Sequence, residues 1–139
     1  MVALGVSRDG YVAFRAALSD PRITHVIALS PVTDLQRLEE FSHIKVNEAV
    51  YGLDAHASEL GRKHLVIQIG SSDTRVGTHE AIELADGIAR AARPATVDMT
   101  FIVTPRPGHA TAEHDRAAQW AIDECDGRAG RSEAGTPTP

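Results

Sequence analysis

Three short loops of the chain carry the residue types that acyl-transfer chemistry requires. Ser7, Asp73 and His109 each follow an apolar run and precede a segment with a helical pattern. A serine hydroxyl is a poor nucleophile until a base takes its proton, and histidine can be that base near neutral pH. A carboxylate orients the imidazole and stabilises its cation. The three residues therefore predict a catalytic triad, in the chain order Ser, Asp, His.

The loop at residues 5–10 has the strand-turn-helix context in which a nucleophilic serine is held on a sharp turn. Gly5 leaves room for that turn. Glycine is also usual two positions after the serine, whereas this chain has Asp9 there, and we expect its side chain to crowd the strand–helix contact. Ser7 could instead be only the N-cap of the following helix, because serine is a favoured cap.

The other two loops supply the acid and the base. Asp73 lies in a Gly-x-x-Asp-x-x-Val string at residues 70–76, directly after an apolar strand, where it could also serve as a helix cap. His109 follows Gly108, between the last predicted strand and the last predicted helix. These positions favour Asp73 as the residue that orients His109.

The remaining six histidines are predicted to have no catalytic role. His25 and His64 begin or lie within predicted strands and are expected to be structural. The other four lie on polar stretches and are expected to be solvated, namely His43, His56, His79 and His114. None combines with neighbouring carboxylates in a metal-ligand spacing. We therefore predict neither a metal site nor a cofactor.

Strand-like and helix-like segments alternate along the chain. Strands are predicted at residues 2–6, 23–29, 64–69 and 97–103, and helices at 10–18, once or twice within 34–60, at 78–90 and at 112–122. This order predicts an α/β fold with a parallel sheet of about four strands and flanking helices. Ligand sites in such sheets lie beyond the carboxyl ends of the strands, which is where the three loops fall. Residues 1–123 are assigned to this domain and 124–139 to a disordered tail.

Composition and charge exclude several classes of function. With 139 residues and 42% apolar residues, the chain suits one folded domain. No apolar run approaches the roughly 20 residues of a membrane helix, and the start lacks the features of a signal peptide. A net charge of −5 with scattered basic residues argues against nucleic acid as a partner. Cys125 is the single cysteine, so a reducing, cytoplasmic setting is expected.

Longer stretches resemble a known family. The chain is similar to the prolyl-oligopeptidase-like and dienelactone-hydrolase-like branch of the α/β-hydrolases at residues 5–11, 20–23, 30–35 and 69–77. In that branch the nucleophile elbow, the sharp turn that carries the catalytic serine, commonly reads Gly-x-Ser-Arg-Gly-Gly-Tyr. The resemblance covers residues 1–123. It implies Ser7 as nucleophile, Asp73 as acid, His109 as base and the backbone N–H of Arg8 as half of the oxyanion hole. Dienelactone hydrolases proper use cysteine, so serine favours an ester or peptide-like substrate.

The resemblance also implies that this chain corresponds to the C-terminal half of such a domain. The second oxyanion donor would then come from the half that is missing, and losing one donor costs roughly 100- to 1000-fold in rate. The strand at Val2–Val6 would become an exposed apolar edge, which predicts a homodimer through that strand.

Two alternatives to an active hydrolase follow. The chain could be a catalytically impaired remnant or a module that binds through its edge strand. A small-molecule-binding domain without catalysis is disfavoured, because the chain has neither Gly-x-Gly-x-x-Gly nor a phosphate-binding Gly-Lys-Ser/Thr loop. Esterase, peptidase and thioesterase activities stay open, as does the activity of this chain by itself.

Overall fold

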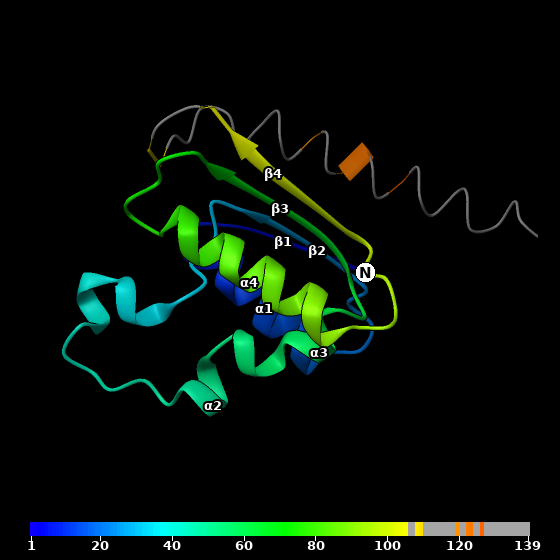
Figure 1. Cartoon of the computed structure of the whole chain (residues 1–139), viewed down its shortest axis with the longest axis horizontal. Helices are drawn as coiled ribbons and strands as arrows, with labels where there is room; N and C mark the ends of the chain where they lie inside the picture. Colours follow the sequence, from blue (N-terminus) through cyan, green and yellow to red (C-terminus); the bar gives the residue numbers. More distant parts are fainter. Residues whose placement is uncertain (106–107, 110–118, 120–121, 124–125, 127–139) are drawn as a thin grey trace, which may run out of the picture.

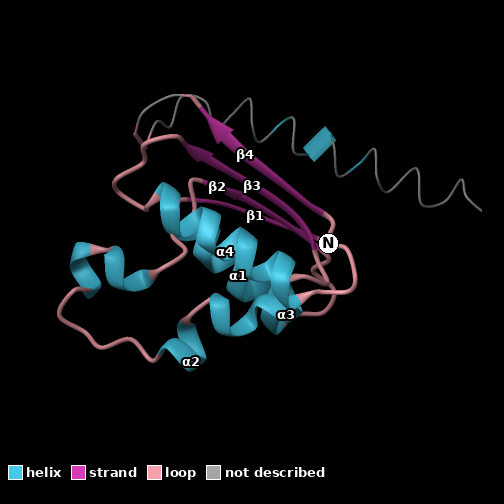
Figure 2. Cartoon of the chain, in the orientation of Figure 1, coloured by secondary structure: helices cyan, strands magenta, loops and turns pink. Residues whose placement is uncertain are grey.

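The strands of the chain join in one parallel sheet. The structure is a computed structural model that describes residues 1–105, 108, 109, 119, 122, 123 and 126. Its four-stranded sheet has the order β1-β2-β3-β4, and every neighbouring pair is parallel (Figure 2). The strands are β1 (Val2–Val6), β2 (His25–Leu29), β3 (His64–Gly70) and β4 (Met99–Thr104). The predicted parallel α/β sheet is confirmed.

Position in the sheet explains the sequence of each strand. The two central strands, β2 and β3, are almost continuously apolar and buried, as expected where both faces are covered. At one edge β4 is only partly buried along its length. At the other edge β1 is paired, within the described sheet, with β2 alone. Because all four strands run the same way, the loops that follow β1, β3 and β4 lie at one end of the sheet.

The helices that follow the strands pack on one face of this sheet. Figure 1 shows α1 (Arg8–Ser19), α3 (Ala57–Leu60) and α4 (Thr78–Ala91) beneath the strands, and α3 contacts both α1 and α4. Their buried apolar residues form one core cluster with β2 and β3. Phe14, Leu60 and Ile88 in this cluster are fully buried. Each such side chain contributes roughly 1.5–3 kcal/mol of burial free energy, which fixes the helices against the strands.

The segment between β2 and β3 differs from the one or two helices predicted there. It contains the 3₁₀ turns η1 (Leu35–Arg37), η2 (Glu39–Phe41) and η3 (Asp54–His56), together with α2 (Glu48–Tyr51) and α3. Within residues 34–60 few side chains are buried, namely Leu38, Leu53, Ala57 and Leu60. Without a sustained apolar stripe, a long helix here would have no face to pack, so the chain forms single turns instead.

The remaining element boundaries match the predictions to within about two residues, a normal uncertainty for helix and strand ends. The predicted helix at 112–122 lies outside the described residues except at 119 and 122. The predicted tail at 124–139 lies outside them except at 126. No helix in the described part of the chain is both long and apolar enough to cross a membrane.

Candidate active site

Ser7 occupies the sharp turn between β1 and α1. Its backbone has φ 57° and ψ −119°, a conformation that residues other than glycine rarely adopt. Three backbone hydrogen bonds hold this turn. The Ser7 N–H donates to the Leu29 carbonyl at 2.9 Å, and the Ser7 carbonyl accepts from the N–H groups of Gly10 at 3.1 Å and Val32 at 3.0 Å. Strain of this kind persists where the surroundings over-determine it, and it is typical of functional sites.

Two glycines make the tight turn sterically feasible. A Cβ added at Gly5 would lie 2.0 Å from the backbone oxygen of Asp9, and one added at Gly10 would lie 2.8 Å from the Cβ of Pro31. The side chain of Asp9 itself is exposed at the start of α1. The expected crowding by Asp9 is therefore not seen, because the close approaches occur at Gly5 and Gly10.

The hydroxyl of Ser7 is not used to cap the helix. Ser7 stands at the N-cap position of α1, yet its side chain makes no capping hydrogen bond. Arg8 is the first residue of the helix, and the first N–H groups of a helix have no acceptor within it. Its guanidinium points to another part of the surface, where it pairs with Glu40 at 2.9 Å. The turn thus presents a serine next to a backbone N–H that the helix does not use.

Asp73 is held rigidly in the loop after β3. It is 2% exposed. Its Oδ1 accepts hydrogen bonds from the backbone N–H groups of Arg75 at 3.0 Å and Val76 at 3.1 Å. The N-cap of α4 is Gly77, so Asp73 does not act as the cap of that helix. With Oδ1 engaged by the loop, Oδ2 is turned toward His109.

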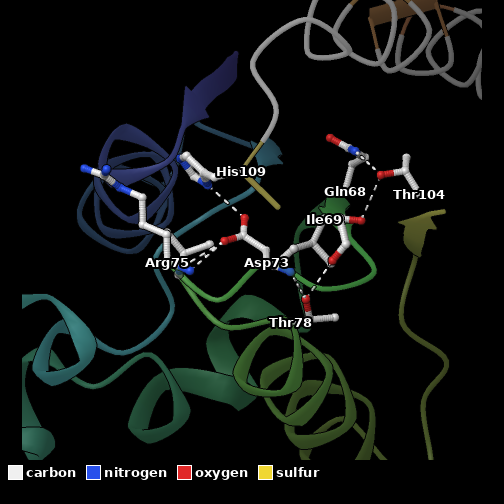
Figure 3. Close-up of polar contacts among 9 residues, drawn as sticks. Gln68, Ile69, Asp73, Arg75, Thr78, Thr104 and His109 are labelled. Carbon is white, nitrogen blue, oxygen red and sulfur yellow. Dashed lines mark hydrogen bonds and ion pairs between the residues drawn. The ribbon is translucent and has the colours of Figure 1, made fainter. Parts of the chain in front are cut away.

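His109 and Asp73 form a direct contact. The Nδ1 of His109 lies 2.8 Å from Oδ2 of Asp73, and the histidine side chain is 18% exposed whereas the aspartate side chain is fully buried (Figure 3). Gly108, with φ 87°, provides the turn that precedes the histidine. A carboxylate on Nδ1 makes Nε2 the ring nitrogen that would take a proton in acyl transfer. The structure therefore brings together two of the three predicted residues.

Ser7 lies at the same end of the sheet as these two residues. The turns that carry Ser7, Asp73 and His109 follow β1, β3 and β4, all at the carboxyl end of the parallel strands. A hydrogen bond joins His109 to Asp73 at this end of the sheet.

Thr78 is a site residue that the sequence analysis missed. Its hydroxyl donates to the Gly70 carbonyl at 2.6 Å and accepts from the Asp73 N–H at 2.9 Å (Figure 3). Gly77 and Thr78 also donate their backbone N–H groups to the Asp73 carbonyl, each at 3.1 Å. Thr78 thus joins the start of α4 by hydrogen bonds to Gly70 and Asp73 in the acid loop, the segment 70–77 between β3 and α4. A threonine at a predicted helix start, five residues after the acid, was the available signal.

The other described histidines lie away from this end of the sheet or on helices and turns at the surface, and His114 lies outside the described residues. His25 and His64 begin neighbouring strands, and their rings stack with centroids 4.3 Å apart. The ring of His64 also contacts Asp98 at 2.7 Å. This pair is at the opposite end of the strands from Ser7, which agrees with a structural role. Within the described residues, no group of histidine, cysteine or carboxylate side chains is arranged to hold a metal ion.

Tyr11 connects the helix after the elbow to the segment between β2 and β3. Its hydroxyl donates to the carbonyl oxygen of Tyr51 at 2.8 Å. Burial raises the pKa of the Tyr11 phenol, with Arg15 acting in the opposite direction. The phenol therefore stays protonated and holds α2 near the start of α1.

Comparison with known proteins identifies the fold. No protein-family model matches the chain, and no curated protein matches it in sequence. An esterase from Pyrococcus furiosus superposes with a TM-score of 0.65 at 19% identity, covering 90% of this chain and 51% of that one. An S-formylglutathione hydrolase from Agrobacterium tumefaciens gives 0.62 at 19% identity, covering 86% and 47%. A puromycin-hydrolyzing peptidase from Mycobacterium tuberculosis gives 0.54 at 13% identity, covering 86% and 20%.

At these identities the likeness establishes architecture. The chain has an α/β-hydrolase fold over the part that superposes, which confirms the fold that the resemblance implied. It spans about half the length of the esterase and hydrolase structures it matches.

Proposed function

We propose that the chain carries the catalytic residues of a serine hydrolase that cleaves an ester or peptide-like acyl bond. The contact between His109 Nδ1 and Asp73 Oδ2 at 2.8 Å carries the proposal, because it prepares the imidazole to act as a base through Nε2. The strained turn at Ser7, at the same end of the sheet, supports the assignment of the nucleophile. The esterase, S-formylglutathione hydrolase and peptidase structures that share the fold agree with this class of reaction.

The proposed reaction has two halves. Ser7 Oγ attacks the carbonyl carbon while its proton passes to Nε2 of His109, which then protonates the leaving alcohol or amine. An acyl-enzyme on Ser7 results. His109 next takes a proton from water as the water attacks the acyl carbon, and that proton returns to Ser7 Oγ when the acid is released. Asp73 stabilises the imidazolium that forms in each half.

Charge on the carbonyl oxygen develops next to the start of α1. The backbone N–H of Arg8 is one proposed donor to this oxyanion, since it lies directly after Ser7 and at the positive end of the helix dipole. Removing a single donor of this kind typically costs roughly 100- to 1000-fold in rate. A donor from outside this chain would therefore strengthen catalysis greatly.

Labelling with a fluorophosphonate probe tests the proposal directly, because such probes react with activated serines. The folded chain is expected to be labelled, Ser7→Ala to lose the label and Ser72→Ala to keep it. Ser72 is an exposed serine in the acid loop, so it controls for non-specific reaction. Equal labelling of the chain and Ser7→Ala, or no labelling of a chain shown to be folded, would refute the assignment.

A second candidate function rests on the edge of the sheet. Within the described sheet β1 pairs only with β2, and its apolar residues Val2 and Leu4 are 52% and 46% exposed. An exposed apolar edge strand is a template for pairing with another chain. We propose a homodimer through the Val2–Val6 strand as the form in which this edge is covered.

A further inference from the structure

The proposed acid and the proposed base are carried by neighbouring strands. Asp73 lies three residues after the end of β3, and His109 lies five residues after the end of β4. Their contact of 2.8 Å therefore depends on how the carboxyl ends of these two strands are held together. Thr78 attaches the acid loop to α4. The base needs an attachment of its own, at the end of β4.

Thr104, the last residue of β4, is hydrogen-bonded to β3 and the acid loop through both its backbone and its side chain. Its carbonyl oxygen accepts from the N–H of Ser71 at 2.8 Å. Its hydroxyl donates to the carbonyl oxygen of Ile69 at 3.3 Å and accepts from the amide Nε2 of Gln68 at 3.2 Å (Figure 3). The end of β4 is therefore joined to residues 68–71 at three points, two of which need the threonine hydroxyl.

Gln68 is an exception among the buried residues of its strand. In the central strand β3 the buried side chains from residue 65 to residue 69 are otherwise aliphatic. Gln68 is 3% exposed and lies in register between Leu29 of β2 and Ile102 of β4. Among the described residues its Oε1 has no hydrogen-bond partner. A buried amide with an unpaired atom costs folding free energy relative to an aliphatic side chain, so stability alone does not account for a glutamine here.

The side chains of Gln68 and Thr104 meet diagonally across the pair β3–β4. Gln68 is opposite Ile102 and Gly70 is opposite Thr104, so the two side chains lie on the same face of the sheet, offset by two residues. This diagonal contact opposes sliding of β4 along β3. The strand β4 is only partly buried along its length, so burial restrains it less than it restrains β3. A movement of the base by about 1 Å away from the acid would take their contact out of hydrogen-bond range.

We propose that Gln68 and Thr104 are positioning residues for His109. The hydrogen bonds from Gln68 to Thr104 and from Thr104 to Ile69 fix the end of β4, and thereby hold Nδ1 of His109 against Asp73. A misplacement of about 1 Å can cost about 100-fold in rate, which is the consequence for catalysis. That consequence rests on the proposed function, whereas the position of the imidazole can be measured without it.

Nuclear magnetic resonance of the full chain measures this position. Long-range proton–nitrogen correlation spectra at about pH 8.5, where free imidazole is neutral, show which ring nitrogen carries the proton. His109 is expected to carry it on Nδ1, which faces a carboxylate. Thr104→Val keeps the shape of threonine without the hydroxyl and should convert His109 to a mixture of both tautomers. Thr104→Ser should restore the parent spectrum.

Fluorophosphonate labelling measures the catalytic consequence. The labelling rate at saturating probe should fall about tenfold in Thr104→Val, whereas the probe concentration that gives half of this rate should not change, because the base is misplaced and the binding surface is intact. Gln68→Met should change the tautomer and the labelling rate in the same direction. It should melt at the same temperature as the parent chain or higher, since it removes the unpaired oxygen. A merely structural role would lower the melting temperature instead.

Thr100→Val is the matched control. Thr100 lies on the same face of β4, nearer the start of the strand, and its replacement should leave the tautomer of His109 unchanged. His64, whose Nδ1 lies 2.7 Å from Asp98 at the other end of β3, is an internal reference in the same spectra. Circular dichroism shows whether each variant is folded.

The outcomes separate the positioning role from the proposed function. An unchanged His109 tautomer in folded Thr104→Val, or an equal change in Thr100→Val, would overturn the positioning role. If labelling requires Ser7 but has the parent rate in Thr104→Val, the positioning role fails and the hydrolase assignment stands. If the tautomer changes as expected but the folded parent chain is never labelled, the positioning role stands and the hydrolase assignment fails.

Discussion

The N–H of Val32 donates a hydrogen bond of 3.0 Å to the carbonyl oxygen of Ser7, so the loop after β2 braces the turn between β1 and α1. The same loop presents Pro31 against Gly10 on the helix side of the turn. The conformation of Ser7 therefore depends on contacts far away in the sequence as well as on its own neighbours. A side chain added at Gly5 or Gly10 should therefore disturb the turn at Ser7 more than it disturbs the sheet.

Gly5→Ala tests the space required at the elbow. The new Cβ would meet the backbone of Asp9 at 2.0 Å, and a backbone atom cannot move aside cheaply. We expect a loss of about 3 kcal/mol in unfolding free energy, at the upper end of overpacking effects. Urea denaturation measures it. Gly87→Ala is the control, because its nearest neighbour lies at 3.6 Å and α4 should gain about 0.5–1 kcal/mol. Equal stability of Gly5→Ala and the parent chain would show that the turn is looser than described.

Thr78→Val tests the anchor of the acid loop. Valine keeps the shape of threonine but leaves the Gly70 carbonyl and the Asp73 N–H without their partner. Unfolding free energy should fall by about 1–3 kcal/mol. Thr78→Ser retains the hydroxyl and should lose less. If valine and serine variants melt at the same temperature, the hydroxyl does not hold the loop.

Asp73→Asn tests how His109 is oriented. The asparagine oxygen can still accept from Arg75 and Val76, so its NH₂ group would face Nδ1 of His109. Nδ1 must then accept a hydrogen bond, which puts the ring proton on Nε2 and removes the base. The rate of fluorophosphonate labelling should fall about 10⁴-fold. The melting temperature shows whether the variant is folded, and a folded variant that labels at the parent rate would exclude Asp73 from the triad.

The extent to which the sequence predicted the fold and the site has a physical explanation. The strands β2 and β3 and the helix α4 were predicted because their burial imposes a simple pattern of apolar residues along the chain. The single turns between β2 and β3 were not predicted, because the buried residues there are too sparse to produce a regular spacing of apolar residues. Asp73 and His109 were predicted as partners from loop position and residue type, and the structure places their side chains in contact. Thr78 was missed because its role depends on its side chain folding back to Gly70, and a threonine at a predicted helix start does not by itself reveal that contact.

Leu4→Lys tests pairing through β1. A lysine in an edge strand opposes strand addition, because its charge would have to be buried in the new pair. If the parent chain is a dimer, the variant should sediment as a monomer in analytical ultracentrifugation. Val12→Lys is the control, since Val12 is 58% exposed on α1 and is not part of the edge strand. Dimers that persist in Leu4→Lys, or that are lost equally in Val12→Lys, would exclude the edge strand as the interface.

Asp20→Asn tests a pH-dependent contact at the end of α1. Hydrogen bonds from the Arg22 side chain, and then from its backbone, hold the pKa of Asp20 below its ordinary value. Arg22 lies 2.7 Å away, and its own pKa is raised by the same contact. A depressed folded pKa means that the carboxylate stabilises the folded chain above the unfolded pKa of about 3.9, and that this contribution is lost as the pH falls through the folded value. The parent chain should therefore melt at a slightly higher temperature than Asp20→Asn at pH 7, and the difference should shrink as the pH falls through the folded pKa. A difference that stays constant across this range would assign the effect to packing instead of charge.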